Sequence, residues 1–187
     1  MIHRSLEDLM DGMDHIAGAP RDAGPVLMIV RRPDRGARQE MTAARIDPRV
    51  GLIGDNWAVK GSQKTKDGSS DPDKQVTIMS SRVIDLLTDG DRSCWGLAGD
   101  QLYVDLNLDP SNLPAGSRLA VGPAILQISD KPHLGCAKFA DHFGVDALRF
   151  VNIGPGRHGN FRGLNARVVT GGTVTVGDPV SKFRGPV

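Results

Sequence analysis

Glycine and proline interrupt this chain so often that it has little room for long helices. The 187 residues include 23 glycines and 12 prolines, and both residue types favour turns over the interior of helices and strands. Short apolar runs lie between these breaks, and several of them alternate apolar and polar residues, as in 102–106, 118–121 and 124–128. Many short strands with regular turns and few helices are typical of a β-barrel or a β-sandwich.

Helical spacing of apolar residues is confined to a few short segments. The segments expected to be helical are 6–16, after the candidate cap Ser5 and before Gly18; 81–87, after the candidate cap Ser80; and 137–143 and 145–151. Two strands near the C-terminus, 165–169 and 173–176, are expected to form a hairpin through Gly171-Gly172. Gly122-Pro123 predicts another tight connection, between strands 118–121 and 124–128.

Composition excludes several classes of function. The formal net charge is +1 and aromatic residues make up 4% of the chain, which disfavours nucleic-acid binding. No apolar run approaches the roughly 20 residues that a membrane span needs, and the acidic N-terminus does not resemble a signal peptide. We therefore expect a cytoplasmic chain whose two cysteines, Cys94 and Cys136, are free thiols.

Length and composition favour one domain over residues 1–187, with 1–24 as an N-terminal helical extension. Residues 60–74 contain almost nothing apolar. This segment is expected to be a mobile surface loop, and it could serve as a lid over a site.

Cys136 is the strongest candidate for a reactive group. It follows a probable strand, and Lys131, His133 and Lys138 lie close to it in sequence. Cations near a thiol favour the thiolate, which attacks electrophiles and binds soft metals. The alternative is a buried structural cysteine that behaves as a small hydrophobic residue.

A glycine-rich segment, Gly154–Gly163, is the second candidate site. Its first six residues match G-x-G-x-x-G, but the segment before it favours helix and the segment after it favours strand. A dinucleotide-binding fold needs the opposite order, so that interpretation is rejected. Arg157, His158 and Arg162 could still make this loop a phosphate cradle, and an ordinary surface loop is the alternative.

Other familiar site patterns are missing from the sequence. The cysteines and histidines lack the spacing of zinc sites, and neither a G-x-S-x-G elbow nor a Walker A motif occurs. Cys94 precedes Trp95 and an apolar run, which favours a packed residue over a nucleophile.

Four motifs in one order resemble the MOSC domain, the C-terminal domain type of the molybdenum cofactor sulfurases. They are Gly99-Asp100-Gln101 followed by a strand, the glycine-rich hairpin 113–124, the Pro132-to-Cys136-Ala137-Lys138 segment, and the ending Arg162-Gly163 to Val180. The resemblance is strongest over residues 99–180. Before that, it is carried loosely by Gly51-Leu52-Ile53-Gly54-Asp55 and by 75–78.

The resemblance implies a mainly β protein: a mostly antiparallel β-barrel of the pyruvate-kinase barrel type with a few short helices. It also implies that Cys136 corresponds to the characteristic cysteine of the family, which ligates molybdenum of a pterin cofactor or carries sulfur. Asp100 and Gln101 occupy the polar pair of the family, where Arg-Asn or Glu-Asn is more common. Arg157, His158, Arg162 and Gly163 would then help to bind the cofactor. The chain has no room for the pyridoxal-phosphate domain of complete sulfurases.

Three hypotheses follow. The first is a molybdenum–pterin protein that reduces small N-oxygenated substrates, with Cys136 as metal ligand. In it His133 serves in proton transfer or only forms a hydrogen bond within the fold, and Lys138 orients an anion or holds the thiolate. The second is a sulfur carrier that uses a Cys136 persulfide. Either would need a redox or sulfur-donor protein partner. The third is a non-catalytic β-barrel module that binds a phosphorylated small molecule or a protein. No residue indicates an oligomeric state.

Overall fold

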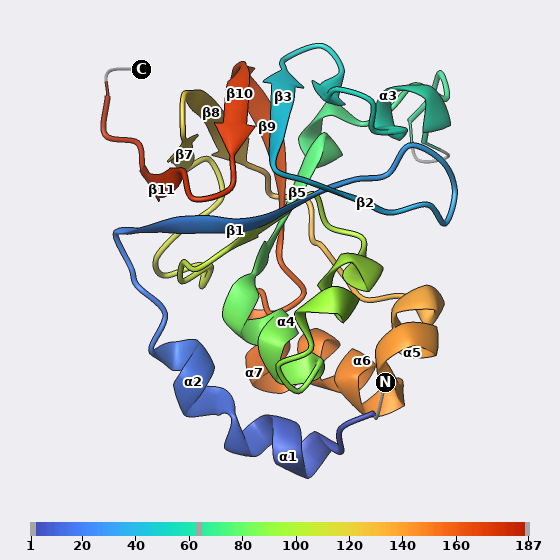
Figure 1. The fold of residues 1–187 in the computed structure, drawn as a ribbon, viewed down its shortest axis with the longest axis vertical. Coiled ribbons are helices and arrows are strands. Elements are labelled where there is room, and N and C mark those ends of the chain that lie inside the picture. The colour runs from blue at the N-terminus through green and yellow to red at the C-terminus, as the bar shows by residue number, and fades with distance from the viewer. Residues whose placement is uncertain (1–2, 63–64, 186–187) are drawn as a thin grey trace.

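Seven strands of the described chain close into a barrel, because β1 pairs with both β6 and β11 (Figure 1). The computed structural model describes residues 3–62 and 65–185. In hydrogen-bonded order the barrel strands are β11 (Pro179–Lys182), β7 (Arg118–Val121), β8 (Ala124–Ile128), β9 (Leu164–Thr170), β5 (Val76–Ser80), β6 (Leu102–Val104) and β1 (Ala23–Arg31). β2 (Gln39–Met41) pairs with the far end of β1.

The barrel is mixed, whereas the sequence resemblance implied an antiparallel one. β5 and β6 are parallel, with Ile78 opposite Leu102 and Ser80 opposite Val104. Parallel neighbours need a long crossover connection, which here carries α4 (Ser81–Leu87) and η2 (Arg92–Ala98). The other neighbouring strands of the barrel are antiparallel. The Gly122-Pro123 connection between β7 and β8 is confirmed.

The expected hairpin through Gly171-Gly172 does not form. β9 pairs with β5 and β8, and β10 (Gly172–Thr175) pairs with β3 in a separate sheet, β10-β3-β4, whose other strands are β3 (Ala43–Asp47) and β4 (Gly51–Leu52). A Cβ on Gly171 would lie 2.7 Å from the Ile46 carbonyl oxygen, and one on Gly172 would lie 2.8 Å from the Pro123 ring. The two glycines therefore allow close passage of the chain between the sheets.

Helices cover one side of the barrel, at the bottom of Figure 1. They are α1 (Leu6–Asp11), α2 (Met13–Ala17), α4, η2, α5 (Ala137–Phe143), α6 (Val145–Asn152) and α7 (Gly154–His158). Two short helices, α3 (Trp57–Lys60) and η1 (Pro72–Lys74), lie in the connection from β4 to β5. Every helix within the described ranges is too short or too polar to cross a bilayer.

The N-terminal helical segment is two helices where the sequence predicted one. Ser5 caps α1 as expected, and its side chain and that of Asp8 form a capping box. The break falls at Gly12, where a Cβ would lie 2.3 Å from a methyl carbon of Leu86. Gly12 therefore lets this segment approach α4 closely. The predicted helices at 81–87, 137–143 and 145–151 are present as α4, α5 and α6.

Both faces of the central strands are buried, against two different cores. Ile78 and Leu102 point into the barrel, where they pack with its other inward apolar residues. Their neighbours Met79 and Tyr103 point outward and pack against the helices. Successive residues of a strand face opposite sides, so β5 and β6 join the barrel core to the helical core. The helices are thus fixed directly on the strands that carry the candidate site.

The polar segment 60–74 has an internal hydrogen bond, and η1 ties its C-terminal end to β9. The Ser62 amide donates to the Gly68 carbonyl at 3.1 Å, and Asp73 of η1 pairs with Arg167 of β9 at 2.8 Å. Residues 63 and 64 of the expected mobile loop lie outside the described residues.

Candidate functional site

A buried carboxylate, Asp100, is the centre of the candidate site. η2 ends at Ala98, and its C-cap residue Gly99 has a left-handed conformation (φ 85°) that turns the chain toward Asp100 and β6. The side chain of Asp100 is fully buried. Its carboxylate accepts from Nη1 of Arg162 at 2.6 Å and from Nε2 of His133 at 2.9 Å. The structure therefore brings together three residues that the sequence nominated.

Electrostatics fix the protonation of this cluster. Burial opposes a charge on Asp100, but Arg162 and His133 outweigh it and lower the pKa of Asp100 to about 2. Burial, followed by repulsion from Arg162, lowers the pKa of His133. At neutral pH, His133 is therefore neutral and donates its Nε2 proton to the ionised Asp100. This arrangement leaves Nδ1 of His133 as an acceptor.

Two arginines from the β1–β2 connection lie over the same turn. Nη1 of Arg32 donates to the Gly99 carbonyl at 2.9 Å, while its Nε and Nη2 bind the two oxygens of buried Asp55 at 2.8 and 2.9 Å. Nε of Arg38 donates to the Gly96 carbonyl at 3.1 Å. Burial and repulsion from Arg32 lower the pKa of Arg38. Three guanidinium groups, those of Arg32, Arg38 and Arg162, therefore lie around two carboxylates, those of Asp55 and Asp100.

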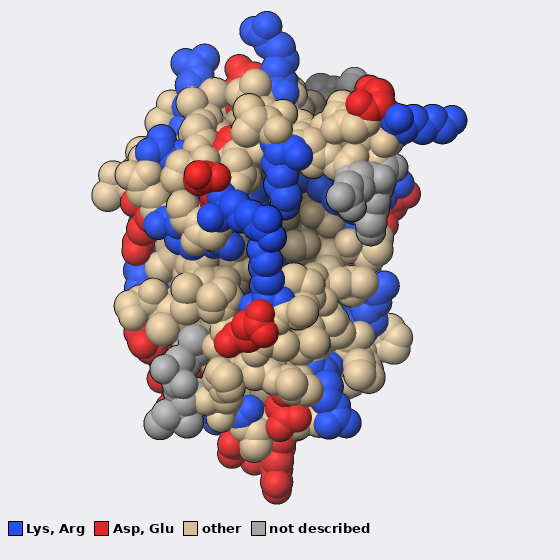
Figure 2. Space-filling view, turned by 90° about the vertical axis from the view of Figure 1, so that its right-hand side faces the viewer, with Lys and Arg blue, Asp and Glu red and all other residues tan. Residues whose placement is uncertain are grey.

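This excess of positive charge has a counterpart on the surface. Figure 2 shows the face on which the β1–β2 connection and α5 lie, with Lys and Arg side chains gathered beside a hollow above the helices. The sequence of this connection is basic, with arginines at 31, 32, 35 and 38. The partner of Arg32 is Asp55, which belongs to the Gly51-to-Asp55 motif. The sequence gives no indication that these two residues pair.

Cys136 is exposed and stands at the start of α5. The preceding loop is held at several points by hydrogen bonds. The Lys131 carbonyl accepts from Nδ2 of Asn165 at 3.1 Å, and His133 is bound to Asp100. Both backbone groups of Gly135 bind the side-chain amide of Asn152, at 2.9 and 3.0 Å. The thiol is therefore accessible while its backbone is anchored.

The first turn of α5 connects Cys136 to the Asp100 cluster. The Phe139 amide donates to the Cys136 carbonyl at 2.9 Å, and the guanidinium of Arg162 lies over the Phe139 ring at 5.0 Å. Nη2 of Arg162 also binds the Ala98 carbonyl at 2.8 Å. Its Nε is buried and has no hydrogen-bond partner among the described residues. A buried donor of this kind requires an explanation such as a bound anion or water.

The remaining nominated residues are dispersed. Lys138 is exposed on the first turn of α5, near Cys136 in sequence. Gln101 is buried and its amide binds Thr77 and Gln75, so it joins β5 to the start of β6. A Cβ on Gly163 would lie 2.3 Å from the Ile78 carbonyl oxygen, so this glycine permits close backbone packing.

The first half of the expected glycine-rich loop is helical, because Gly154–His158 forms α7. Arg157 and His158 are exposed on this helix, whereas Arg162 is buried at the Asp100 cluster. The sequence interpretation that grouped these residues into one cradle rested on their proximity in the chain. The structure gives them different surroundings.

The described residues contain no group of three His, Cys, Asp or Glu side chains placed to hold a metal ion. A single exposed thiol can still ligate a metal that arrives with other ligands of its own. This face therefore offers one thiol and one neutral imidazole as possible metal ligands, and several guanidinium groups as hydrogen-bond donors to an anion.

A model of the MOSC domain matches residues 65–181. The chain belongs to the MOSC domain family. Solved structures share this fold at low sequence identity. The YuaD protein from Bacillus subtilis is 17% identical, with a TM-score of 0.59, and the match covers 87% of this chain and 97% of that one. YiiM from Escherichia coli is 19% identical, with a TM-score of 0.56 and coverage of 88% and 71%.

YiiM from Geobacillus stearothermophilus is 14% identical, with a TM-score of 0.58 and coverage of 86% and 75%. No curated protein sequence gives a significant match. The matched family segment includes Asp100, His133, Cys136 and Arg162, so the candidate site lies within the MOSC part of the chain.

Proposed function

We propose that this MOSC protein binds a molybdenum–pterin cofactor at the face formed by the Asp100 cluster and Cys136, and reduces small N-oxygenated substrates there. The observation that carries the proposal is the exposed thiol of Cys136 on an anchored loop beside a buried Asp–His–Arg cluster. Thiolate is a soft ligand suited to a transition metal.

Anion recognition supports the same assignment. A pterin cofactor of this class carries phosphate, which guanidinium groups bind well. Arg38 and Lys138 are exposed at this face, and the buried Nε of Arg162 is an unused donor among the described residues. Nε, Nη1 and Nη2 of Arg32 each form a hydrogen bond to Asp55 or Gly99, so Arg32 contributes charge and holds the turn.

Proton supply is the task proposed for His133. Removing one oxygen from an N-oxygenated substrate as water consumes two protons and two electrons. When bound, the cofactor would supply the two-electron chemistry, and a reduced electron-transfer protein would replenish it. Asp100 holds the Nε2 proton of His133, which leaves Nδ1 to take up and release a proton. Asp100 acts here as a positioning residue.

The test is metal and pterin content, measured on the full chain purified from a host that makes the cofactor. We expect near-stoichiometric molybdenum in the wild type and its loss in Cys136→Ala. Cys94→Ala is the matched control, because Cys94 lies in η2 and its thiol bonds to Asp91 at 3.2 Å. Metal-free wild-type protein with a native circular dichroism spectrum, or equal metal in Cys136→Ala, would overturn the proposal.

A sulfur carrier is the second candidate, and the exposure of Cys136 favours it. A persulfide needs an accessible thiol and a donor protein, and it does not need bound molybdenum. Mass spectrometry of wild-type protein exposed to a cysteine desulfurase and cysteine would show a gain of one sulfur on Cys136. Metal-free protein that accepts sulfur at Cys136 would favour this function over cofactor binding.

A further inference from the structure

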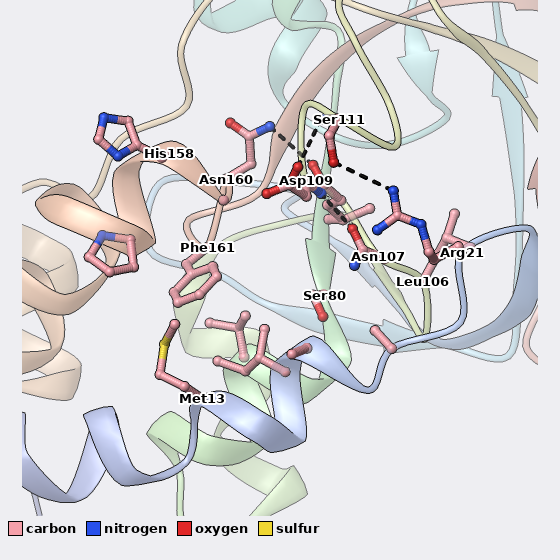
Figure 3. Close-up of a pocket in the computed structure, with 17 residues that line it drawn as sticks. Met13, Arg21, Ser80, Leu106, Asn107, Asp109, Ser111, His158, Asn160 and Phe161 are labelled. Carbon is pink, nitrogen blue, oxygen red and sulfur yellow. Dashed lines mark hydrogen bonds between the residues drawn. The ribbon is translucent and has the colours of Figure 1, made fainter.

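A cavity of about 450 Å³ lies on another part of the helical layer. It is bounded by α2, by the connection that follows β6, and by α7 with the residues after it (Figure 3). None of the residues that line it belongs to the Asp100 cluster or to the Cys136 loop. α2 and α5 also lie on different sides of the helical layer in Figure 1. The cavity is therefore separate from the site proposed above.

The floor of the cavity is apolar, and its rim carries both signs of charge. The apolar lining includes Met13, Ile16, Val83, Leu106 and Phe161. Figure 3 shows Met13 and Phe161 toward one end and Arg21, Asp109 and Ser111 toward the other. Nη2 of Arg21 lies 3.4 Å from the Ser111 hydroxyl, and the Ser111 amide donates to Asp109 at 2.8 Å. Such a rim does not select for a net charge.

An unsatisfied hydroxyl lies in the wall of this cavity. Ser80 is 5% exposed, and its Oγ has no hydrogen-bond partner among the described residues. Ser80 is the N-cap residue of α4, as the sequence predicted, yet its side chain makes no capping bond. Serine is favoured at this position because its oxygen normally accepts from the first turn of the helix. A buried polar atom without a partner is costly, and a water or ligand in the cavity would satisfy this hydroxyl.

We infer that this cavity binds a neutral heteroaromatic molecule of about two rings that forms a hydrogen bond with Ser80. Its volume falls within the range of roughly 300–1,000 Å³ that is typical of small-molecule sites. A flat ring system would contact the apolar floor, where Phe161 offers an aromatic ring and Met13 a polarizable sulfur. A ring nitrogen would satisfy the Ser80 hydroxyl, which can donate or accept.

Benzimidazole at pH 8 is the probe, because it is neutral there and carries one donor and one acceptor. Titration of the ¹⁵N-labelled full chain is followed by amide NMR. We expect saturable shifts confined to 13–21, 80–83, 106–111 and 155–161. Ser80→Ala should weaken binding about 3–10-fold, the effect of one neutral hydrogen bond. Indene, a ring analogue without nitrogen, should bind both proteins equally.

Ala17→Trp fills the cavity from an exposed position and should abolish binding, while Ala58→Trp, on exposed α3, should leave it unchanged. The amide spectra also report whether each variant is folded. Three results would each overturn the inference: no saturable shift in the wild type, unchanged binding in folded Ala17→Trp, or shifts centred on residues 133–138.

Discussion

Asp100 and Cys136 belong to one candidate site, but they differ in burial and in side-chain pairing. Asp100 is fully buried, and its carboxylate is paired with Arg162 and His133. Cys136 is exposed, and within residues 3–62 and 65–185 the hydrogen bonds it forms use its backbone carbonyl. The difference separates two tasks: a rigid charged centre that fixes the geometry, and a reactive group that stays open to a ligand. It predicts that substitutions at the centre cost stability and substitutions at the thiol do not.

The largest effect is expected for Asp100→Ala. The substitution leaves Arg162 buried without its carboxylate, and breaking a buried ion pair from one side costs about 3–5 kcal/mol. Urea unfolding should show this loss in the free energy of unfolding. Asp130→Ala is the control, since Asp130 is exposed and 3.7 Å from Lys131, and it should change stability by less than about 0.5 kcal/mol. Similar stability in the two variants would contradict a structural role for the buried cluster.

The cluster should also make the fold sensitive to acid. The pKa of His133 is lower in the folded chain than its ordinary value of 6.5, so the unfolded chain binds a proton more readily below that pH. Stability should therefore begin to fall as the pH drops below about 6.5. Asp100 extends the loss from its ordinary pKa of 3.8 toward about 2, because only the unfolded chain is protonated in that interval.

His133→Asn separates these two contributions. The variant lacks the imidazole and should show a flatter dependence of unfolding free energy on pH between about 5 and 6.5. For the wild type and for the variant, the free energy of unfolding at each pH is compared with that protein's own value at pH 8. A wild-type curve that stays level down to pH 5 would contradict the assignment of a neutral His133.

The loop between the two regions should respond to an intermediate degree. Asn152→Ala removes two hydrogen bonds to Gly135, at 2.9 and 3.0 Å, and should cost about 1–3 kcal/mol. Asn152→Asp keeps the acceptor for the Gly135 amide but places a second carboxylate oxygen against the Gly135 carbonyl, so it should also be destabilised. If both variants were as stable as wild type, the backbone before Cys136 would not be held by Asn152.

Sequence patterns predicted this molecule well where contacts are local. Alternation identified β7 and β8, and helical spacing identified α5 and α6 on either side of Gly144. The parallel pairing of β5 with β6 and the closure between β1 and β11 depend on contacts between distant segments. The Gly171-Gly172 hairpin failed for the same reason, since β3 offers β10 a partner that no local pattern shows.

The candidate site divides in the same way. Motifs named Asp100, His133, Cys136 and Arg162, but nothing local showed that Asp100 joins His133 to Arg162. Arg32 and Asn152 were missed as supporting residues. Arg32 is one of four arginines between positions 31 and 38, and its partner Asp55 lies 23 residues away. Arg157 and His158 are exposed on α7, whereas Arg162 is buried, because α7 ends before the chain turns inward at Arg162.

The smallest effect on stability is expected at the thiol itself. Cys136→Ala should change the free energy of unfolding by less than about 0.5 kcal/mol, because an exposed side chain away from the core contributes little. The same exposure should make Cys136 the first site of alkylation in the native chain. The hydrogen bond from Cys94 to Asp91 raises the pKa of Cys94 and so disfavours its thiolate. Iodoacetamide at pH 7.5, followed by peptide mass spectrometry over time, measures both rates. Faster modification of Cys94 would mean that Cys136 is shielded, and would remove the contrast between a closed centre and an open thiol.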